Sequence, residues 1–167
     1  MRTLLIGGAL VVAVASLVAC GGSSTSSAPE QAVQRKADSW EIDGIEKKFH
    51  EATTKKDIRL MMSLWAPNAT FTFGPGQTAT GKKQIRRVFL EESKSFLPTN
   101  YWISDHPAYK VRITVNGDRG TLHFECHYVD AKTGKVVAAT AADLDVARIN
   151  GKWLITNMVG GSTTLSV

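Results

Sequence analysis

Residues 136–160 read VVAATAADLDVARINGKWLITNMVG, and this segment gives the strongest local indication of the fold. Asn150-Gly151 separates two runs rich in β-branched and apolar residues, which is the strongest short-range signal for a β-hairpin because both central turn positions favour φ > 0. Side chains alternate across a strand, so Asp143 and Asp145 are predicted to share one face with Ala141. Two carboxylates on a strand face that otherwise carries small, apolar side chains lie either at the margin of the sheet or in a pocket.

The N-terminus resembles the signal peptide of bacterial lipoproteins. Arg2 precedes an apolar run from Leu4 to Val18 that is too short to span a bilayer comfortably, and the run ends in Leu17-Val18-Ala19-Cys20. The resemblance implies that residues 1–19 are removed and that Cys20 carries acyl chains such as palmitate, which anchor the protein to a cell membrane. A secretory signal with an incidental Cys and an uncleaved anchor are the alternatives. We therefore expect a lipoprotein of the bacterial cell envelope, with its domain outside the cytoplasm.

The remaining chain divides into a short tether and one domain. Residues 20–37 are small and polar after Cys20, which predicts a flexible tether, and residues 38–167 suit one compact domain. Cys126 then has no partner for an internal disulfide. The formal net charge of +5 is modest, which favours solvated helix surfaces over a nucleic-acid partner, although contact with anionic lipid headgroups is an alternative.

Local patterns predict an α+β fold. Asp38 and Glu41 are spaced as a capping box that opens a first helix, and Asp57 is placed to cap a second. A short strand over residues 69–73 precedes a third helix that follows Gly81, and about four antiparallel strands follow from Tyr101 onward. Helices packed on one face of a curved antiparallel sheet satisfy this order.

Four motifs resemble the NTF2-like superfamily, close to its SnoaL-like and ketosteroid-isomerase-like branches. They are LWAPNATF (residues 64–71), TGKKQIR (80–86), VNGD (115–118) and RINGKWLI (148–155). The resemblance implies a cone in which three N-terminal helices pack on a curved antiparallel sheet, with an apolar pocket at the wide end. Members of this superfamily commonly form homodimers through the sheet, so the resemblance also implies a homodimer.

The resemblance further implies which positions carry catalysis in the isomerase branch. That branch uses a carboxylate base, a helical Tyr and a protonated Asp as oxyanion donors. The motifs place Phe73 at the base position, Phe49 at the Tyr position and Asp145 at the acid position. Isomerase activity is therefore not expected. A pocket-facing Asp145 could still act with Asp143 as an acid/base pair, whereas exposure to water or pairing with Arg or Lys would make both residues structural.

Two further residue sets are candidates for binding. His123, Glu125 and His127 share one strand face and form a weak candidate metal site, because residues at i and i+2 lie about 7 Å apart along a strand. His50 and His106 are interpreted as ordinary surface or boundary histidines. No cofactor motif is present, so no cofactor is expected. The expected apolar ligand pocket consists of Phe49, Trp65, Phe71, Phe73, Trp102, Leu122, Phe124 and Met158.

These observations favour a membrane-anchored, non-catalytic domain that binds a small apolar ligand or an envelope partner protein. One alternative is a SnoaL-like lyase or isomerase that uses Asp145 with Asp143 on a small hydrophobic substrate. A second alternative is a dimerisation or assembly module, whose sheet face carries His123, Glu125 and His127.

Overall fold

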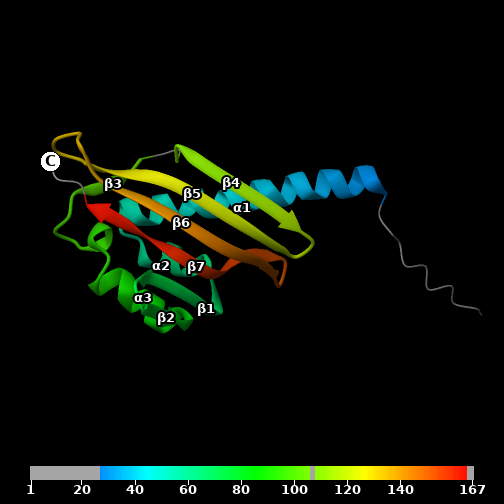
Figure 1. Cartoon of the computed structure of the whole chain (residues 1–167), viewed down its shortest axis with the longest axis horizontal. Coiled ribbons are helices and arrows are strands. Elements are labelled where there is room, and N and C mark those ends of the chain that lie inside the picture. The colour runs from blue at the N-terminus through cyan, green and yellow to red at the C-terminus, as the bar shows by residue number, and fades with distance from the viewer. Residues whose placement is uncertain (1–26, 106–107, 165–167) are drawn as a thin grey trace, which may run out of the picture.

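The computed structural model describes residues 27–105 and 108–164, and within these ranges it contains three α-helices and a curved sheet of seven strands (Figure 1). The strand order is β2-β1-β7-β6-β5-β3, with β4 paired to β5. In chain order the elements are α1 (Ala28–Lys55), α2 (Ile58–Ser63), β1 (Trp65–Gly74), β2 (Gln77–Thr80), α3 (Gly81–Glu91), the 3-10 turn η1 (Lys94–Phe96), β3 (Trp102–Ser104), β4 (Lys110–Asn116), β5 (Arg119–Asp130), β6 (Val136–Ile149) and β7 (Lys152–Thr164).

The hairpin formed by β6 and β7 confirms the strongest local prediction. Asn150 and Gly151 have φ values of 51° and 75°, and Ile149 pairs with Lys152, as a two-residue turn with two left-handed residues requires. The predicted helices α2 and α3 are also present. The Asp57 carboxylate accepts hydrogen bonds from the backbone N–H groups of Arg59 and Leu60, and α2 therefore begins where its cap predicts.

The sheet is mixed, so the expectation of a purely antiparallel sheet was wrong. Strand β1 runs parallel to the C-terminal strand β7, with Phe71 opposite Met158. All of the elements from β2 to β6 lie between these two strands in the sequence. Parallel neighbours need a crossover connection instead of a tight turn, and no local motif marks their pairing.

Helix α1 begins ten residues before the predicted start, at Ala28 in place of Asp38. The backbone N–H of Ser27 donates to Glu30 Oε2 at 2.7 Å, and Pro29 lies in the first turn. Residues 28–37 are therefore helical, which corrects that part of the flexible tether, and these first turns extend past the strands (Figure 1). Asp38 is not a cap: it is buried in the helix, where it pairs with Arg148.

The hydrophobic core lies between the helices and one face of the sheet, which we call the inner face. Ile42, Ile45 and Phe49 of α1 meet inward-facing residues of β5 such as Leu122 and Phe124. Ile85, Val88 and Phe89 of α3 complete the core beside β1, as the apolar pattern of that helix predicts. The opposite, outer face of the sheet is covered by no helix in the described part of the chain (Figure 1).

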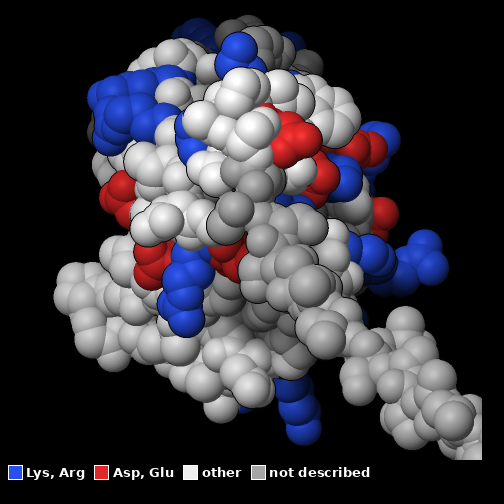
Figure 2. All heavy atoms as spheres, turned by 90° about the vertical axis from the view of Figure 1, so that its right-hand side faces the viewer, with Lys and Arg blue, Asp and Glu red and all other residues white. Residues whose placement is uncertain are grey.

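Charge is spread over the surface without one dominant patch on the face that Figure 2 shows. Lys and Arg side chains are interspersed there with Asp and Glu. Two basic residues of α1 pair with acidic neighbours one turn away: Lys47 with Asp43, and Lys55 with Glu51. Among the helices that the structure describes, none is both long enough and apolar enough to cross a membrane.

Candidate ligand-binding site

A cavity of about 270 Å³ lies between the inner face of the sheet and the segment formed by α3 and η1. Most of its aromatic lining comes from α1, β1, α3 and β5. Its polar lining comes from η1 and the two residues before it, from the N-terminal part of β6 and from the C-terminal end of β7. The lining residues are Phe49, Phe71, Phe73, Val88, Phe89, Glu92, Ser93, Lys94, Ser95, Trp102, Phe124, Tyr128, Thr140, Met158, Gly160, Gly161, Ser162 and Thr164.

The aromatic side chains of the lining pack on one another. The Phe71 and Phe89 rings are stacked, with centroids 5.5 Å apart, and the Phe49 ring lies 5.9 Å from Phe89 and 5.5 Å from Phe124. Phe73 extends this wall beyond Phe71, again at 5.5 Å. Rings that contact each other in these geometries hold their positions, so the wall provides a preformed apolar surface.

Hydroxyl groups form the other side of the cavity. Ser162 donates a hydrogen bond to Thr140 Oγ1 at 3.0 Å, and Thr140 donates to the Gly161 carbonyl oxygen at 2.8 Å. The hydroxyls of Ser93 and Ser95 lie 3.0 Å apart. Burial raises the pKa of Tyr128 to about 12, although the hydroxyls of Ser95 and Ser162 act in the opposite direction. We call Ser93, Ser95, Tyr128, Thr140 and Ser162 the hydroxyl cluster.

Gly160 allows strands β6 and β7 to approach closely beside this cluster. A Cβ atom at Gly160 would lie 2.6 Å from the Ala141 carbonyl oxygen and 2.8 Å from the Ala142 Cβ atom. Both distances are shorter than van der Waals contact, so a side chain at this position would push the strands apart. The glycine therefore shapes the floor of the cavity.

The structure separates the predicted pocket residues into two groups. Phe49, Phe71, Phe73, Trp102, Phe124 and Met158 line the cavity. Trp65 and Leu122 do not, because both lie in the solid core with no exposed surface. Sequence reasoning missed the hydroxyl cluster, although strand alternation already placed Tyr128 on the same face as Phe124.

Asp143 and Asp145 lie on the outer face of the sheet, away from the cavity. Their neighbours Ala142, Leu144 and Val146 point inward and are buried, so alternation directs the two carboxylates outward. The Asp143 side chain is 77% exposed, and Asp145 Oδ2 accepts a hydrogen bond from Asn157 Nδ2 at 3.2 Å. The catalytic acid/base role required a pocket-facing Asp145, and this geometry does not provide one.

On the outer face, His123 joins two carboxylates into one network. His123 Nδ1 lies 2.7 Å from Asp143 Oδ1, and His123 Nε2 lies 3.0 Å from Glu125 Oε1. Glu125 also contacts Lys110 Nζ at 2.7 Å and accepts a hydrogen bond from the Tyr109 hydroxyl. Hydrogen bonds from Lys110, His123 and Tyr109 lower the pKa of Glu125 to about 2.

This network leaves no metal site at the predicted position. His127 stacks on the Tyr109 ring at 4.7 Å, and its Nδ1 lies 3.5 Å from Asp105 Oδ2. Within the described ranges, 27–105 and 108–164, no three His, Cys, Asp or Glu side chains are grouped as metal ligands. Each member of the candidate set is instead engaged by another side chain.

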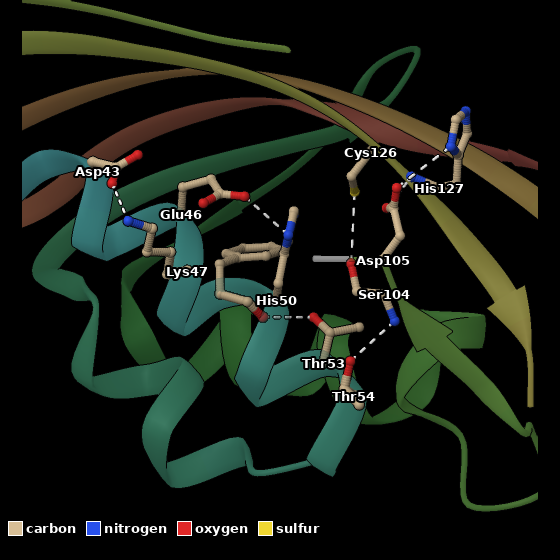
Figure 3. Close-up of polar contacts among 11 residues, drawn as sticks. Asp43, Glu46, Lys47, His50, Thr53, Thr54, Ser104, Asp105, Cys126 and His127 are labelled. Carbon is tan, nitrogen blue, oxygen red and sulfur yellow. Dashed lines mark hydrogen bonds and ion pairs between the residues drawn. The ribbon is translucent and has the colours of Figure 1, made fainter. Parts of the chain in front are cut away.

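A buried polar pair lies behind the aromatic wall, and it corrects the interpretation of His50 as a surface or boundary histidine. His50 and Glu46 are each 1% exposed, one turn apart on α1, and His50 Nδ1 lies 2.9 Å from Glu46 Oε1 (Figure 3). The His50 ring also meets Phe124 edge-on at 5.3 Å. Their spacing on the same face as Ile42 and Phe49 was the available signal. His106 lies outside the described residues.

The same region contains the buried thiol of Cys126. Its sulfur lies 3.7 Å from the Ser104 hydroxyl oxygen, and Figure 3 shows both on the side of α1 that carries Glu46 and His50. Burial raises the pKa of Cys126 to about 12, so the thiol stays protonated and unreactive at neutral pH. Neither this thiol nor the Glu46–His50 pair lines the cavity.

Comparison with known proteins identifies the family. The family model of the SnoaL-like domain matches residues 47–154. A search of curated protein sequences gives no match.

Solved structures share the fold at low identity. A protein with a cystatin-like fold from Nostoc punctiforme has a TM-score of 0.65 at 20% identity, over 76% of this chain and 92% of that one. An NTF2-like protein from Novosphingobium aromaticivorans has a TM-score of 0.64 at 14% identity, over 83% and 90%. Hexachlorocyclohexane dehydrochlorinase LinA-type3 from Novosphingobium barchaimii has a TM-score of 0.66 at 15% identity, over 81% and 94%. With its α+β architecture and the family match over most of the domain, this chain belongs to the SnoaL-like family of NTF2-like proteins.

Proposed function

We propose that this protein is a non-catalytic SnoaL-like domain that binds a small apolar ligand in the cavity beside α3. The aromatic wall carries the proposal, because it offers a preformed apolar surface with a few polar groups opposite, as ligand sites do. The volume of about 270 Å³ is slightly below the range of about 300–1,000 Å³ usual for ligand pockets. A ligand of one or two rings therefore suits the site better than a large polycyclic molecule.

A lyase or isomerase is the rival function. It draws support from the structural similarity to a protein named as a dehydrochlorinase. Proton abstraction needs a base within hydrogen-bond reach of the substrate. Among the described residues that line the cavity there is no Asp or His, and the carboxylate of Glu92 belongs to an exposed residue. This arrangement favours binding over catalysis by Asp145 and Asp143.

Blocking the cavity tests the proposal. Ser162 is exposed and lines the open part of the site, so Ser162→Phe is expected to fill the cavity while leaving the core intact. Native mass spectrometry of the purified protein should detect a retained small molecule at one per chain, and the variant should lose it. Thr163→Phe is the matched control, because Thr163 is exposed on the opposite face of the same strand. Retention of the same molecule by Ser162→Phe would contradict this location.

Membrane anchoring through Cys20 belongs to the same proposal. The lipobox-like residues 17–20 support it, and the domain would then lie outside the cytoplasm of a bacterium. Cys20→Ala expressed in a bacterial host should abolish metabolic labelling with palmitate and release the protein from the membrane fraction. Membrane association and labelling that survive the substitution would refute the anchor.

A homodimer through the outer face is the remaining part of the proposal. That face is not covered by the helices, and it exposes Val159 beside the ordered network of His123, Glu125 and Asp143. The same native mass spectra count the chains per particle. A monomer at micromolar concentration would rule out the dimer without affecting the cavity.

A further inference from the structure

Helix α1 carries a stripe without polar side chains on the side that faces away from the core. Its members are Val33, Ala37, Trp40 and Gly44, whose spacing of three and four residues places them on one face of the helix. Trp40 is 74% exposed and Val33 is 68% exposed, although both side chains are apolar. The buried residue Ile42 follows Trp40 by two positions and therefore points to the opposite side. We call these four exposed or half-buried residues the α1 stripe.

The stripe is open to its surroundings and occupies only the N-terminal half of the helix. A Cβ atom at Gly44 would meet no atom of the described chain within 4 Å, so there is free space beside the helix. Farther along the same face the side chains become charged, because Lys47 pairs with Asp43 and Glu51 pairs with Lys55. Apolar side chains grouped on an exposed face indicate a contact surface.

The helix begins a few residues after the proposed lipid anchor. Residues 21–27 separate Cys20 from Ala28, the first residue of α1. Even a fully extended segment of this length spans at most about 30 Å, because each residue adds about 3.5 Å. Trp40 then lies about 18 Å farther along the helix, at 1.5 Å per residue. The α1 stripe is therefore within reach of any bilayer that holds the acyl chains of Cys20.

The direction of the stripe suits a helix that lies along a bilayer surface. Since the stripe and the core are on opposite sides of α1, the helix can meet the membrane while the sheet stays above it in water. The ring of Trp is favoured at the membrane–water interface, and surface helices bury their apolar face at the headgroup boundary. Lys36 and Lys47 lie on the same face as Trp40, where Lys side chains attract anionic headgroups.

The small size of the stripe argues against a protein partner. A stable protein interface takes about 20–30 residues from each side, whereas the α1 stripe and its two lysines comprise far fewer. A membrane contact needs less area because the anchor already holds the chain at the surface. A weak second contact then acts at high effective concentration and only has to orient the domain.

We propose that the α1 stripe rests on the bilayer surface beside the anchor and fixes the orientation of the domain on the membrane. Trp40 lies at the headgroup boundary, with Val33 and Ala37 beside it. This inference rests on the proposed anchor at Cys20 and adds a second, non-covalent contact with the same lipid surface. The partner is a membrane that contains anionic lipid.

Quenching of Trp40 fluorescence by brominated lipid tests this contact. The full chain, lipidated in a bacterial host, is reconstituted into vesicles of phosphatidylcholine and phosphatidylglycerol, with or without bromine on the acyl chains. Brominated chains should reduce the emission of the wild type, and Trp40→Phe should lose most of this reduction, because Trp65 and Trp153 are buried. Trp102→Phe is the control and should keep the reduction, because Trp102 is half-buried and lines the cavity.

A charge placed in the stripe tests which face of the helix makes the contact. Ala37→Asp and Ala28→Asp form a matched pair, because both alanines are exposed residues of α1 and lie nine positions apart, on opposite sides of the helix. Ala37→Asp should abolish most of the quenching of Trp40, whereas Ala28→Asp should retain it although it is closer to the anchor. Equal loss in both variants would mean general repulsion of an acidic helix and would overturn the stripe as the contact.

Flotation of the vesicles separates this inference from the anchor. Protein that does not float with the vesicles refutes the anchor, and the membrane contact that rests on it falls as well. Protein that floats but is quenched equally in the wild type and in Trp40→Phe overturns the contact and leaves the anchor intact. If Val33→Cys chains then cross-link through a disulfide on the vesicles, the stripe is an interface between two copies of the chain instead.

Discussion

Arg148→Met is expected to lower the free energy of unfolding by about 3 kcal/mol, because it leaves the carboxylate of Asp38 buried without its cation. Asp38 is 3% exposed, and the Arg148 guanidinium donates to it across the gap between β6 and α1. Arg148 also contacts Asp118 through Nε at 3.1 Å and lies over the Trp153 ring at 4.8 Å. One side chain thus joins the helix, the β4–β5 turn and the final hairpin.

The pH dependence of this loss identifies the ion pair as its cause. Burial raises the pKa of Asp38, but hydrogen bonds from Arg148 and Gln34 outweigh it, and the net pKa lies below the usual value of 3.8. A carboxyl group with a lowered pKa stabilises the fold above its unfolded pKa, and this contribution is lost as the pH falls. The difference between wild type and Arg148→Met should therefore be largest near pH 7 and shrink below about pH 4.

Urea unfolding followed by circular dichroism measures both effects. Asp118→Asn is the matched control, since the Asp118 side chain is 78% exposed and its pair with Arg148 should contribute less than about 1 kcal/mol. A loss for Arg148→Met no larger than that for Asp118→Asn would show that the buried pair does not hold α1 to the sheet.

His50→Leu is expected to destabilise the protein by about 3 kcal/mol, although it replaces a polar residue in the core by an apolar one. The substitution leaves the Glu46 carboxylate, which is 1% exposed, without the imidazole that lies 2.9 Å away. The cost comes from Glu46, because a buried polar group that loses its hydrogen-bonding partner keeps the penalty of leaving water.

The double variant Glu46→Leu/His50→Leu provides the decisive comparison. Removing both partners also removes the desolvation penalty, and replacing both members of a buried polar pair by apolar residues of similar shape is often nearly neutral or stabilising. The double variant should therefore recover most of the stability that His50→Leu loses, as thermal unfolding can measure. If both variants are equally unstable, packing around Phe124 and not the polar pair accounts for the loss.

Local signals in the sequence were sufficient for much of the fold. Asn150-Gly151 specified the last hairpin through its two left-handed residues, and Asp57 specified the start of α2 through a side-chain cap. Part of the cavity lining could also be predicted from the sequence, because its Phe residues fall on apolar faces that repeat with the period of each element. These residues are Phe49, Phe71, Phe73 and Phe124. Each of these signals acts within a few residues of the chain.

Tertiary structure alone decided which carboxylates meet the core. Alternation placed Asp143 and Asp145 on one face, but the burial of Ala142 and Leu144 against the helices determined that this face is the outer one. Asp38, which resembled a helix cap, became a buried partner of Arg148, 110 residues away in sequence. A cap or a turn depends on backbone geometry within one segment, whereas burial depends on what a distant segment brings against it.

Sequence motifs were therefore sufficient to predict the family, the α+β class and the turn of the last hairpin. The folded structure was needed to reveal the parallel pairing of β1 with β7, the burial of Glu46 with His50 and the assembly of the hydroxyl cluster around Tyr128. These features join residues from separate elements, and their free energy comes from desolvation and packing that exist only after the chain has folded.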